Sequence, residues 1–174
     1  PLPDAPDRYV IVSAGGGAEG YTLAAPCIEA WKQLSAQGST ENREMVIFAG
    51  AFIDTASFAA LKDLCANGPF RLERFATDFL RWMHNADLSI NRAGYNTGMN
   101  VLETRTRCIL VPSVAMDDQE FRTRKLAEQG IAQMIHPDTL SSGRVADAIL
   151  RGLSHPLPAH KLELNGAQRT LEFV

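Results

Sequence analysis

Short apolar runs alternate with amphipathic stretches along most of the chain. The apolar runs are bounded by glycine, proline or charged residues, which is typical of buried strands. In the stretches between them, apolar residues recur three and four positions apart, and this spacing predicts helices. The predicted strands are 9–12, 45–48, 70–75, 88–90, 108–111 and 131–135, and helices are expected up to about residue 37, around 58–65, over 77–85, from about 97, from 117 or 118 to 130, and from 141 or 142 to 153.

The alternation of strands with helices predicts a parallel sheet that helices cover on both faces. The expected fold class is therefore α/β, a Rossmann-like sheet of about six strands. In such a sheet, ligands bind at the carboxyl ends of the strands, beside the N-termini of the following helices. Candidate functional residues are thus to be sought in the loops that follow strands.

The length of 174 residues fits one folded domain. Residues 1–8 contain three prolines and are expected to be the remnant of an inter-domain linker. Residues 9–155 are expected to form the domain, and residues 156–174 a C-terminal tail with a further helix from Gly166. Because the chain opens on Pro1 rather than Met, we expect it to be a piece of a longer protein.

Composition narrows the function classes. Seventeen basic against twenty acidic residues give a net charge of −3, which excludes a nucleic-acid binder with a basic face over the whole fold. No apolar run is long enough for a membrane span and no signal peptide opens the chain, so a cytoplasmic location is expected. Three cysteines without a C-x-x-C pair and four scattered histidines do not indicate a disulfide framework or a metal site, and the cysteines are expected in the core.

The loop after the first predicted strand is rich in glycine. Gly15, Gly16 and Gly17 begin a stretch that matches G-x-G-x-x-G, a pattern that lets backbone amides approach a phosphate. An NAD-binding fold also needs an acidic residue at the end of the second strand, whereas here the first acid is Asp54. The alternative is a tight turn that requires a positive φ.

The loop after the fourth predicted strand is more specific. Gly94, Tyr95, Asn96 and Thr97 lead into a helix, and free amides at its N-terminus would form an anion pocket suited to a diphosphate. The alternative is ordinary capping, in which Asn96 or Thr97 serves only the helix.

These loops belong to a set of motifs whose order and spacing resemble a known family. The chain resembles the C-terminal domain of GT-B glycosyltransferases of the MurG type, and within them a bacterial branch of predicted glycosyltransferases. MurG-type enzymes transfer N-acetylglucosamine from UDP-GlcNAc to the peptidoglycan lipid precursor. The resemblance is best over 70–150 and is carried by Gly15-Gly16-Gly17, Gly94-Tyr95-Asn96-Thr97, Leu110-Val111-Pro112, Asp118-Gln119-Glu120, Arg124-Lys125-Leu126-Ala127 and His136-Pro137-Asp138.

The resemblance implies roles for these residues. The backbone amides at 94–97 would hold the diphosphate, and the loop 15–17 would face the phosphates and the acceptor side. The backbone of Phe75 and Ala76 would read the uracil edge. Gln119 and Glu120 would bind hydroxyls of the donor sugar, although Glu120 also fits an exposed place in the first turn of its helix. Asn100 stands where the family usually has a glutamate that accepts from both ribose hydroxyls, and an amide offers only one acceptor oxygen.

The resemblance therefore implies the donor-binding half of an inverting-type GT-B glycosyltransferase (a hexosyltransferase) with a UDP-GlcNAc-like UDP-sugar as substrate and an unknown acceptor. The catalytic base is expected in a missing N-terminal domain or partner chain, so the isolated chain is expected to be inactive. No cofactor is expected, and without an Asp-x-Asp triplet the leaving UDP would be stabilised by amides rather than by a metal. The alternatives are a non-catalytic nucleotide-sugar-binding subunit, and a nucleotide-sugar epimerase in which Glu120 is the candidate carboxylate.

Overall fold

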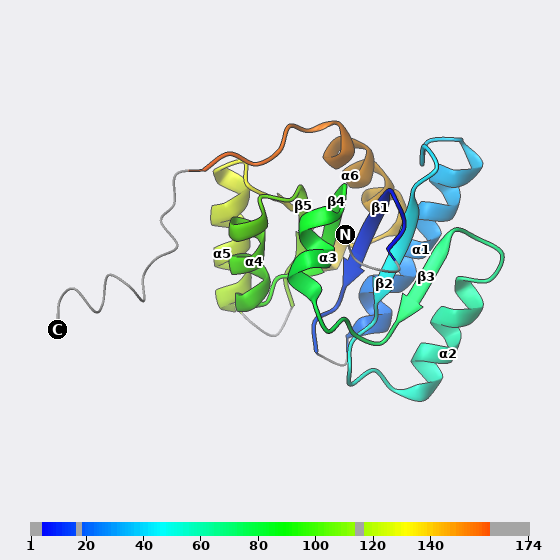
Figure 1. Cartoon of the computed structure of the whole chain (residues 1–174). Coiled ribbons are helices and arrows are strands. Elements are labelled where there is room, and N and C mark those ends of the chain that lie inside the picture. Colours follow the sequence, from blue (N-terminus) through cyan, green and yellow to red (C-terminus); the bar gives the residue numbers. More distant parts are fainter. Residues whose placement is uncertain (1–4, 17–18, 114–116, 161–174) are drawn as a thin grey trace, which may run out of the picture.

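A six-stranded parallel sheet forms the centre of the computed structural model, which describes residues 5–16, 19–113 and 117–160 (Figure 1). The strands lie in the order β3-β2-β1-β4-β5-β6, and each neighbouring pair is parallel. The predicted α/β class is confirmed. The strands are β1 (Tyr9–Ser13), β2 (Glu44–Phe48), β3 (Phe70–Glu73), β4 (Leu88–Arg92), β5 (Cys108–Val111) and β6 (Gln133–Met134).

Helices cover both faces of the sheet (Figure 1). On one face lie α1 (Gly20–Ala36), α2 (Thr55–Leu64) and α6 (Ser142–Ser154). On the other lie α3 (Phe79–Asn85), α4 (Tyr95–Thr104) and α5 (Asp117–Glu128), and a short 3-10 turn, Pro137–Thr139, precedes α6. Within the described ranges, none of these helices is both long and apolar enough to cross a bilayer.

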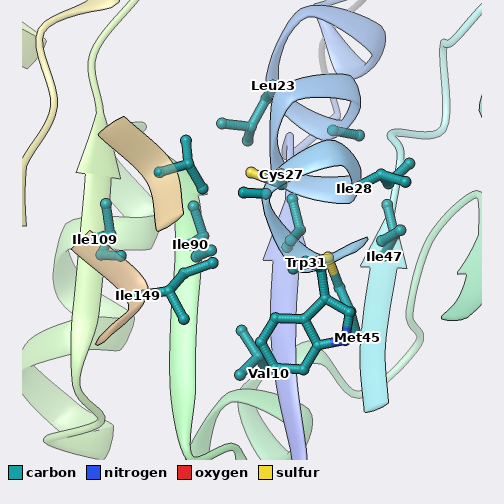
Figure 2. Packing of buried hydrophobic residues seen from close by; sticks show 14 of the residues in the cluster. Val10, Leu23, Cys27, Ile28, Trp31, Met45, Ile47, Ile90, Ile109 and Ile149 are labelled. Atoms are coloured by element: carbon teal, nitrogen blue, oxygen red, sulfur yellow. The ribbon is translucent and has the colours of Figure 1, made fainter. Parts of the chain in front are cut away.

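The larger core lies between the sheet and α1. Figure 2 shows Leu23, Cys27, Ile28 and Trp31 of α1 directed at the strands, and all four side chains are fully buried. Alternate residues of each strand face this layer, because successive side chains of a strand point to opposite faces. Burial on both faces explains why the strands appear in the sequence as continuous apolar runs.

Two element boundaries differ from the sequence expectation. Helix α4 begins at Tyr95, not at Thr97, because Gly94 in an extended conformation (φ −61°, ψ 160°) serves as its N-cap. Helix α3 begins at Phe79 rather than at residue 77, with Asp78 as its N-cap, and the Asp78 carboxylate pairs with Arg81 at 3.1 Å.

Two strands are shorter than expected, and α1 contains a proline. Strand β3 ends at Glu73, and β6 has only two residues at the edge of the sheet. Pro26 lies in the interior of α1. An interior proline costs about 3 kcal/mol, and burial of the apolar face of α1 offsets that cost.

The last glycine of the G-x-G-x-x-G match has a packing role. Gly20 is the first residue of α1, and a Cβ placed there would lie 1.8 Å from the backbone oxygen of Ala49, which follows β2. Only a residue without a side chain lets the start of α1 approach the carboxyl end of β2 this closely. This contact fixes where α1 begins relative to the edge of the sheet.

We therefore expect Gly20→Ala to lower the free energy of unfolding by about 2–3 kcal/mol, the cost of overpacking a closed site. Gly143→Ala is the matched control, because a Cβ at this α6 position meets open space. Exchange of a helical glycine for alanine should leave stability unchanged or raise it by about 0.5–1 kcal/mol. Denaturant unfolding of both variants measures the difference in their free energies of unfolding. Equal unfolding midpoints for the two variants would refute the close contact between Gly20 and the backbone of Ala49.

The expected core placement of the cysteines is confirmed for Cys27 and Cys108, which are buried, while Cys65 is half-buried. Burial raises the pKa of the Cys27 and Cys108 thiols to about 12 and that of Cys65 to about 11. Because the thiolate is the nucleophile, we expect all three to react slowly with a disulfide reagent at pH 8 in the folded chain and rapidly after unfolding.

The same shifts predict how stability depends on pH. A thiol whose pKa is raised by folding stabilises the folded state below its unfolded pKa and loses that contribution as pH rises. The free energy of unfolding should therefore decrease above pH 9, the ordinary thiol value. Denaturant titrations from pH 8 to pH 10 measure this, with Cys27→Ala as the variant in which the decrease should be smaller.

Candidate functional site

The strand order places a crevice at the carboxyl edge of the sheet. From β1 the chain continues toward β2 and β3, whereas from β4 it continues toward β5 and β6, so the loops after β1 and β4 diverge. Ligands of open α/β sheets bind at this switch point. The structure has a pocket of about 260 Å³ here, lined by Ser13, Gly15, Gly16, Phe48, Ala51, Arg74, Phe75, Ala76, Phe79, Asn96, Thr97 and Asn100.

The loop after β1 forms one wall of this switch-point pocket. Gly15 has a positive φ of 68°, a conformation that favours glycine, and its amide donates to the Ser13 hydroxyl at 3.3 Å. The Ala14 amide donates to the carbonyl of Phe48 at 3.2 Å, so the loop leaves the sheet still paired with β2. The tight-turn interpretation is thus confirmed at Gly15, and the turn presents Gly15 and Gly16 to the pocket.

The N-terminus of α4 forms the opposite wall. The first backbone hydrogen bond of this helix runs from the Gly98 amide to the Gly94 carbonyl at 3.1 Å. The amides at 95–97 therefore have no carbonyl partner within the helix, and Gly94 has no side chain to accept from them. The ordinary capping interpretation of Asn96 and Thr97 is wrong, because both lie inside the helix. These amides and the helix dipole give this wall a positive potential.

A third wall comes from the loop after β3. The Gly50 amide donates to the Arg74 carbonyl at 2.8 Å, and Arg74 Nη1 donates to the Ile53 carbonyl at 2.8 Å. The guanidinium of Arg74 also stacks 4.3 Å above the ring of Phe58. These contacts hold Arg74, the residue before Phe75, and Phe75 is 62% exposed beside the pocket. A wider hollow of about 640 Å³ continues from here along β3.

The structure thus brings together seven of the residues named from the sequence, and places the others differently. Gly94 and Tyr95 begin α4 beside the pocket but do not line it, and Tyr95 is 65% exposed. Gly17 lies outside the described residues. The seven that line the pocket are Gly15, Gly16, Phe75, Ala76, Asn96, Thr97 and Asn100.

Gln119 and Glu120 do not line the switch-point pocket. Gln119 Oε1 accepts from the Ser113 amide at 3.0 Å, which joins α5 to the loop after β5. The Glu120 carboxylate pairs with Arg124, and it lies 3.8 Å from His136 Nε2. Both side chains are held by residues of this chain, on the β5 side of the carboxyl edge.

The remaining charged candidates have structural roles. Asp54 caps α2, where its carboxylate accepts from the Ser57 amide at 2.8 Å. Hydrogen bonding by the Ser57 side chain, and then by the Ser57 amide, holds the pKa of Asp54 below its usual value. The acid that an NAD-binding interpretation would need is thus used for capping. The basic run on α5 is ion-paired within the helix, through Arg122–Asp118, Arg124–Glu120 and Lys125–Glu128. Among the described residues, no three His, Cys, Asp or Glu gather where they could hold a metal ion.

Sequence reasoning missed several pocket residues. Ser13 and Phe48 are the last residues of β1 and β2, so the rule that ligands bind at strand carboxyl ends would have found them. Arg74 falls within the predicted strand 70–75, and nothing in the local pattern showed its long-range contacts.

Comparisons with known proteins agree with this geometry. The model of the glycosyltransferase family 28 C-terminal domain matches residues 10–171. A UDP-N-acetylglucosamine--N-acetylmuramyl-(pentapeptide) pyrophosphoryl-undecaprenol N-acetylglucosamine transferase of Rickettsia rickettsii is 25% identical over 154 residues, covering 86% of this chain and 40% of its own length. An uncharacterised glycosyltransferase of Methanopyrus kandleri is 22% identical over 166 residues, covering 95% of this chain and 44% of its own length.

The fold is also shared with a solved structure. MurG of Acinetobacter baumannii superposes with a TM-score of 0.68 and 21% identity, over 98% of this chain and 50% of that one. The chain spans less than half the length of the two sequence relatives it matches. The resemblance drawn from its motifs is confirmed: the chain belongs to the glycosyltransferase family 28 C-terminal domain family, with a MurG-like GT-B fold.

Proposed function

We propose that the chain is the donor-binding half of a glycosyltransferase and that the switch-point pocket holds a UDP-sugar. One observation carries the proposal: a single pocket is lined by the loop after β1, the loop after β3 and the start of α4. Their chemistry suits the parts of a nucleoside diphosphate. Free amides fit the phosphates, backbone beside an exposed aromatic ring fits a nucleobase, and a polar side chain fits the ribose.

The diphosphate takes the central position in this proposal. It lies between Gly15 and Gly16 on one side and the amides at 95–97 on the other, with the uracil at Phe75 and Ala76 and the ribose near Asn100. The negative charge that develops on the leaving UDP is stabilised by amides already in place. This arrangement needs no metal ion, and the positive end of the α4 dipole adds to it.

The donor sugar extends toward the β5 side in this proposal, where Gln119 and Glu120 lie, and a UDP-GlcNAc-like donor carrying a hexose or N-acetylhexosamine is proposed. The acceptor hydroxyl attacks the anomeric carbon while UDP leaves, and a base from a second domain or partner chain takes the proton. The exposed rings of Phe52, Phe75 and Tyr95 near the pocket provide apolar surface for such a domain to cover. The chain alone is expected to bind the donor without transferring the sugar.

Calorimetric titration with UDP, UDP-GlcNAc, a second UDP-sugar and NAD tests the proposal. We expect UDP and at least one UDP-sugar to bind and NAD not to bind. At a hundred times the dissociation constant, UDP should add about 2.7 kcal/mol of stability, visible as a rise in Tm. Failure of every UDP compound to bind would overturn the proposal, and sugar transfer by the chain alone would overturn the assignment of the base to a second domain.

The amides of α4 are tested by Tyr95→Pro. Proline is well accommodated at the first position of a helix, and the extended Gly94 before it is compatible with proline. This variant therefore removes one amide N–H while the helix remains. Tyr95→Ala is the matched control that loses the ring but keeps the amide. We expect Tyr95→Pro to bind UDP about tenfold more weakly than Tyr95→Ala, the loss of one hydrogen bond to a charged group.

The ribose position is tested by Asn100→Glu. A carboxylate accepts from both ribose hydroxyls where the amide oxygen accepts from one, so we expect UDP to bind about tenfold more tightly. The comparison ligand is 2′-deoxy-UDP, for which the gain should be clearly smaller because one hydroxyl is missing. An equal gain for both nucleotides, or no gain for either, would contradict the placement of the ribose beside Asn100.

A further inference from the structure

Three segments of the carboxyl edge meet at one largely buried arginine. Arg92 is the last residue of β4, and its side chain is only 12% exposed. Its Nη2 donates to the Thr22 hydroxyl in the first turn of α1 at 2.7 Å, and its Nη1 donates to the Pro112 carbonyl after β5 at 3.3 Å. One guanidinium thus contacts the segments that follow β1 and β5 as well as its own strand.

Glu19 completes this contact. The carboxylate of Glu19, the residue before α1, lies 3.3 Å from Arg92 Nε, as an ion pair rather than an aligned hydrogen bond. Its other oxygen accepts from the Ser113 hydroxyl at 3.1 Å. Burial lowers the pKa of Arg92 and the charge of Glu19 opposes that shift, while an arginine stays charged at neutral pH in any case. The cluster Glu19–Arg92–Ser113 links residues that are far apart in the sequence.

The position of this cluster gives it a role in the site. Glu19 follows Gly16 by three residues, and Arg92 precedes the first amide of α4 by three. The cluster therefore connects the two walls between which the diphosphate is placed. All three guanidinium nitrogens face groups of the chain, Nη1 and Nη2 in hydrogen bonds and Nε in the ion pair, so the guanidinium is used in holding these segments together.

We propose that Arg92 is a positioning residue of the donor site, which acts through Glu19 to hold the loop after β1 at the distance from α4 that a diphosphate requires. This inference rests on the proposed function. Diphosphate binding depends on the distance between the two walls, because amides must reach the same anion from both sides. Nucleobase binding at Phe75 and Ala76 involves the β3 side of the pocket and does not depend on the cluster.

The test compares UDP with uridine for the unmodified chain, Arg92→Met, Glu19→Gln, and the double variant. We expect each single variant to bind UDP about tenfold more weakly, a usual size for the loss of one partner in a charged network. Uridine affinity should stay within about twofold, and the double variant should be no weaker than either single one, because both remove the same link. Arg151→Met, at the far end of α6, is the control that removes an exposed arginine and should change neither affinity.

Several outcomes overturn the proposal. An increase in UDP affinity for Glu19→Gln would mean that Arg92 contacts the phosphate itself once released, and that Glu19 only competes for it. If a variant lost affinity for UDP and for uridine to the same extent, the substitution would have caused a general structural defect rather than a specific loss of diphosphate binding. The Glu19 side chain is half-exposed and glutamine has nearly the same shape, so Glu19→Gln should fold normally. This variant therefore tests the proposal even if Arg92→Met does not fold. If the unmodified chain does not bind UDP, whether or not it binds uridine, the proposed function itself fails. That result is distinct from a loss of UDP affinity that occurs only in the variants.

Discussion

The pairing of β1 with β4 is the constraint on which the carboxyl edge depends. These two strands lie side by side in register, with Val12 opposite Ile90 and Ser13 opposite Asn91. Their following loops leave in opposite directions, so the glycine turn after β1 and the start of α4 face each other across the switch-point pocket. Close contacts determine the geometry on both sides, with Gly20 against Ala49 and Arg92 beside Glu19.

The electrostatics of this edge come mainly from the backbone. Of the described residues that line the switch-point pocket, one has a cationic side chain, Arg74, and its guanidinium is hydrogen-bonded to a carbonyl and stacked on a ring. Positive potential therefore arises from the amides at 95–97 and the dipole of a ten-residue helix. Such a site suits a ligand whose anionic group approaches the backbone closely, and it fits a chain whose net charge is −3.

Much of the fold was predictable from the sequence, and the failures have physical causes. Central strands such as β1 and β5 appear as uninterrupted apolar runs because both of their faces are covered. The start of α4 was misplaced because its N-cap is a glycine, which gives no side-chain signal, while Asn96 and Thr97 resemble caps. Seven site residues follow from loop position and family resemblance, whereas Arg74 and Arg92 act through contacts with residues distant in sequence that no local pattern records.

The central claim is that the α4 N-terminus binds the diphosphate of the donor. The most direct measurement is a titration of the ¹⁵N-labelled chain with UDP, followed by amide resonances. We expect the largest shifts at the amides of residues 95–97 and of Gly15 and Gly16. Diphosphate binding at α4 would be contradicted if these amide resonances did not move and the shifts appeared instead around Arg107 and Gln133. Those residues lie beside a hollow of about 370 Å³ at the β6 edge.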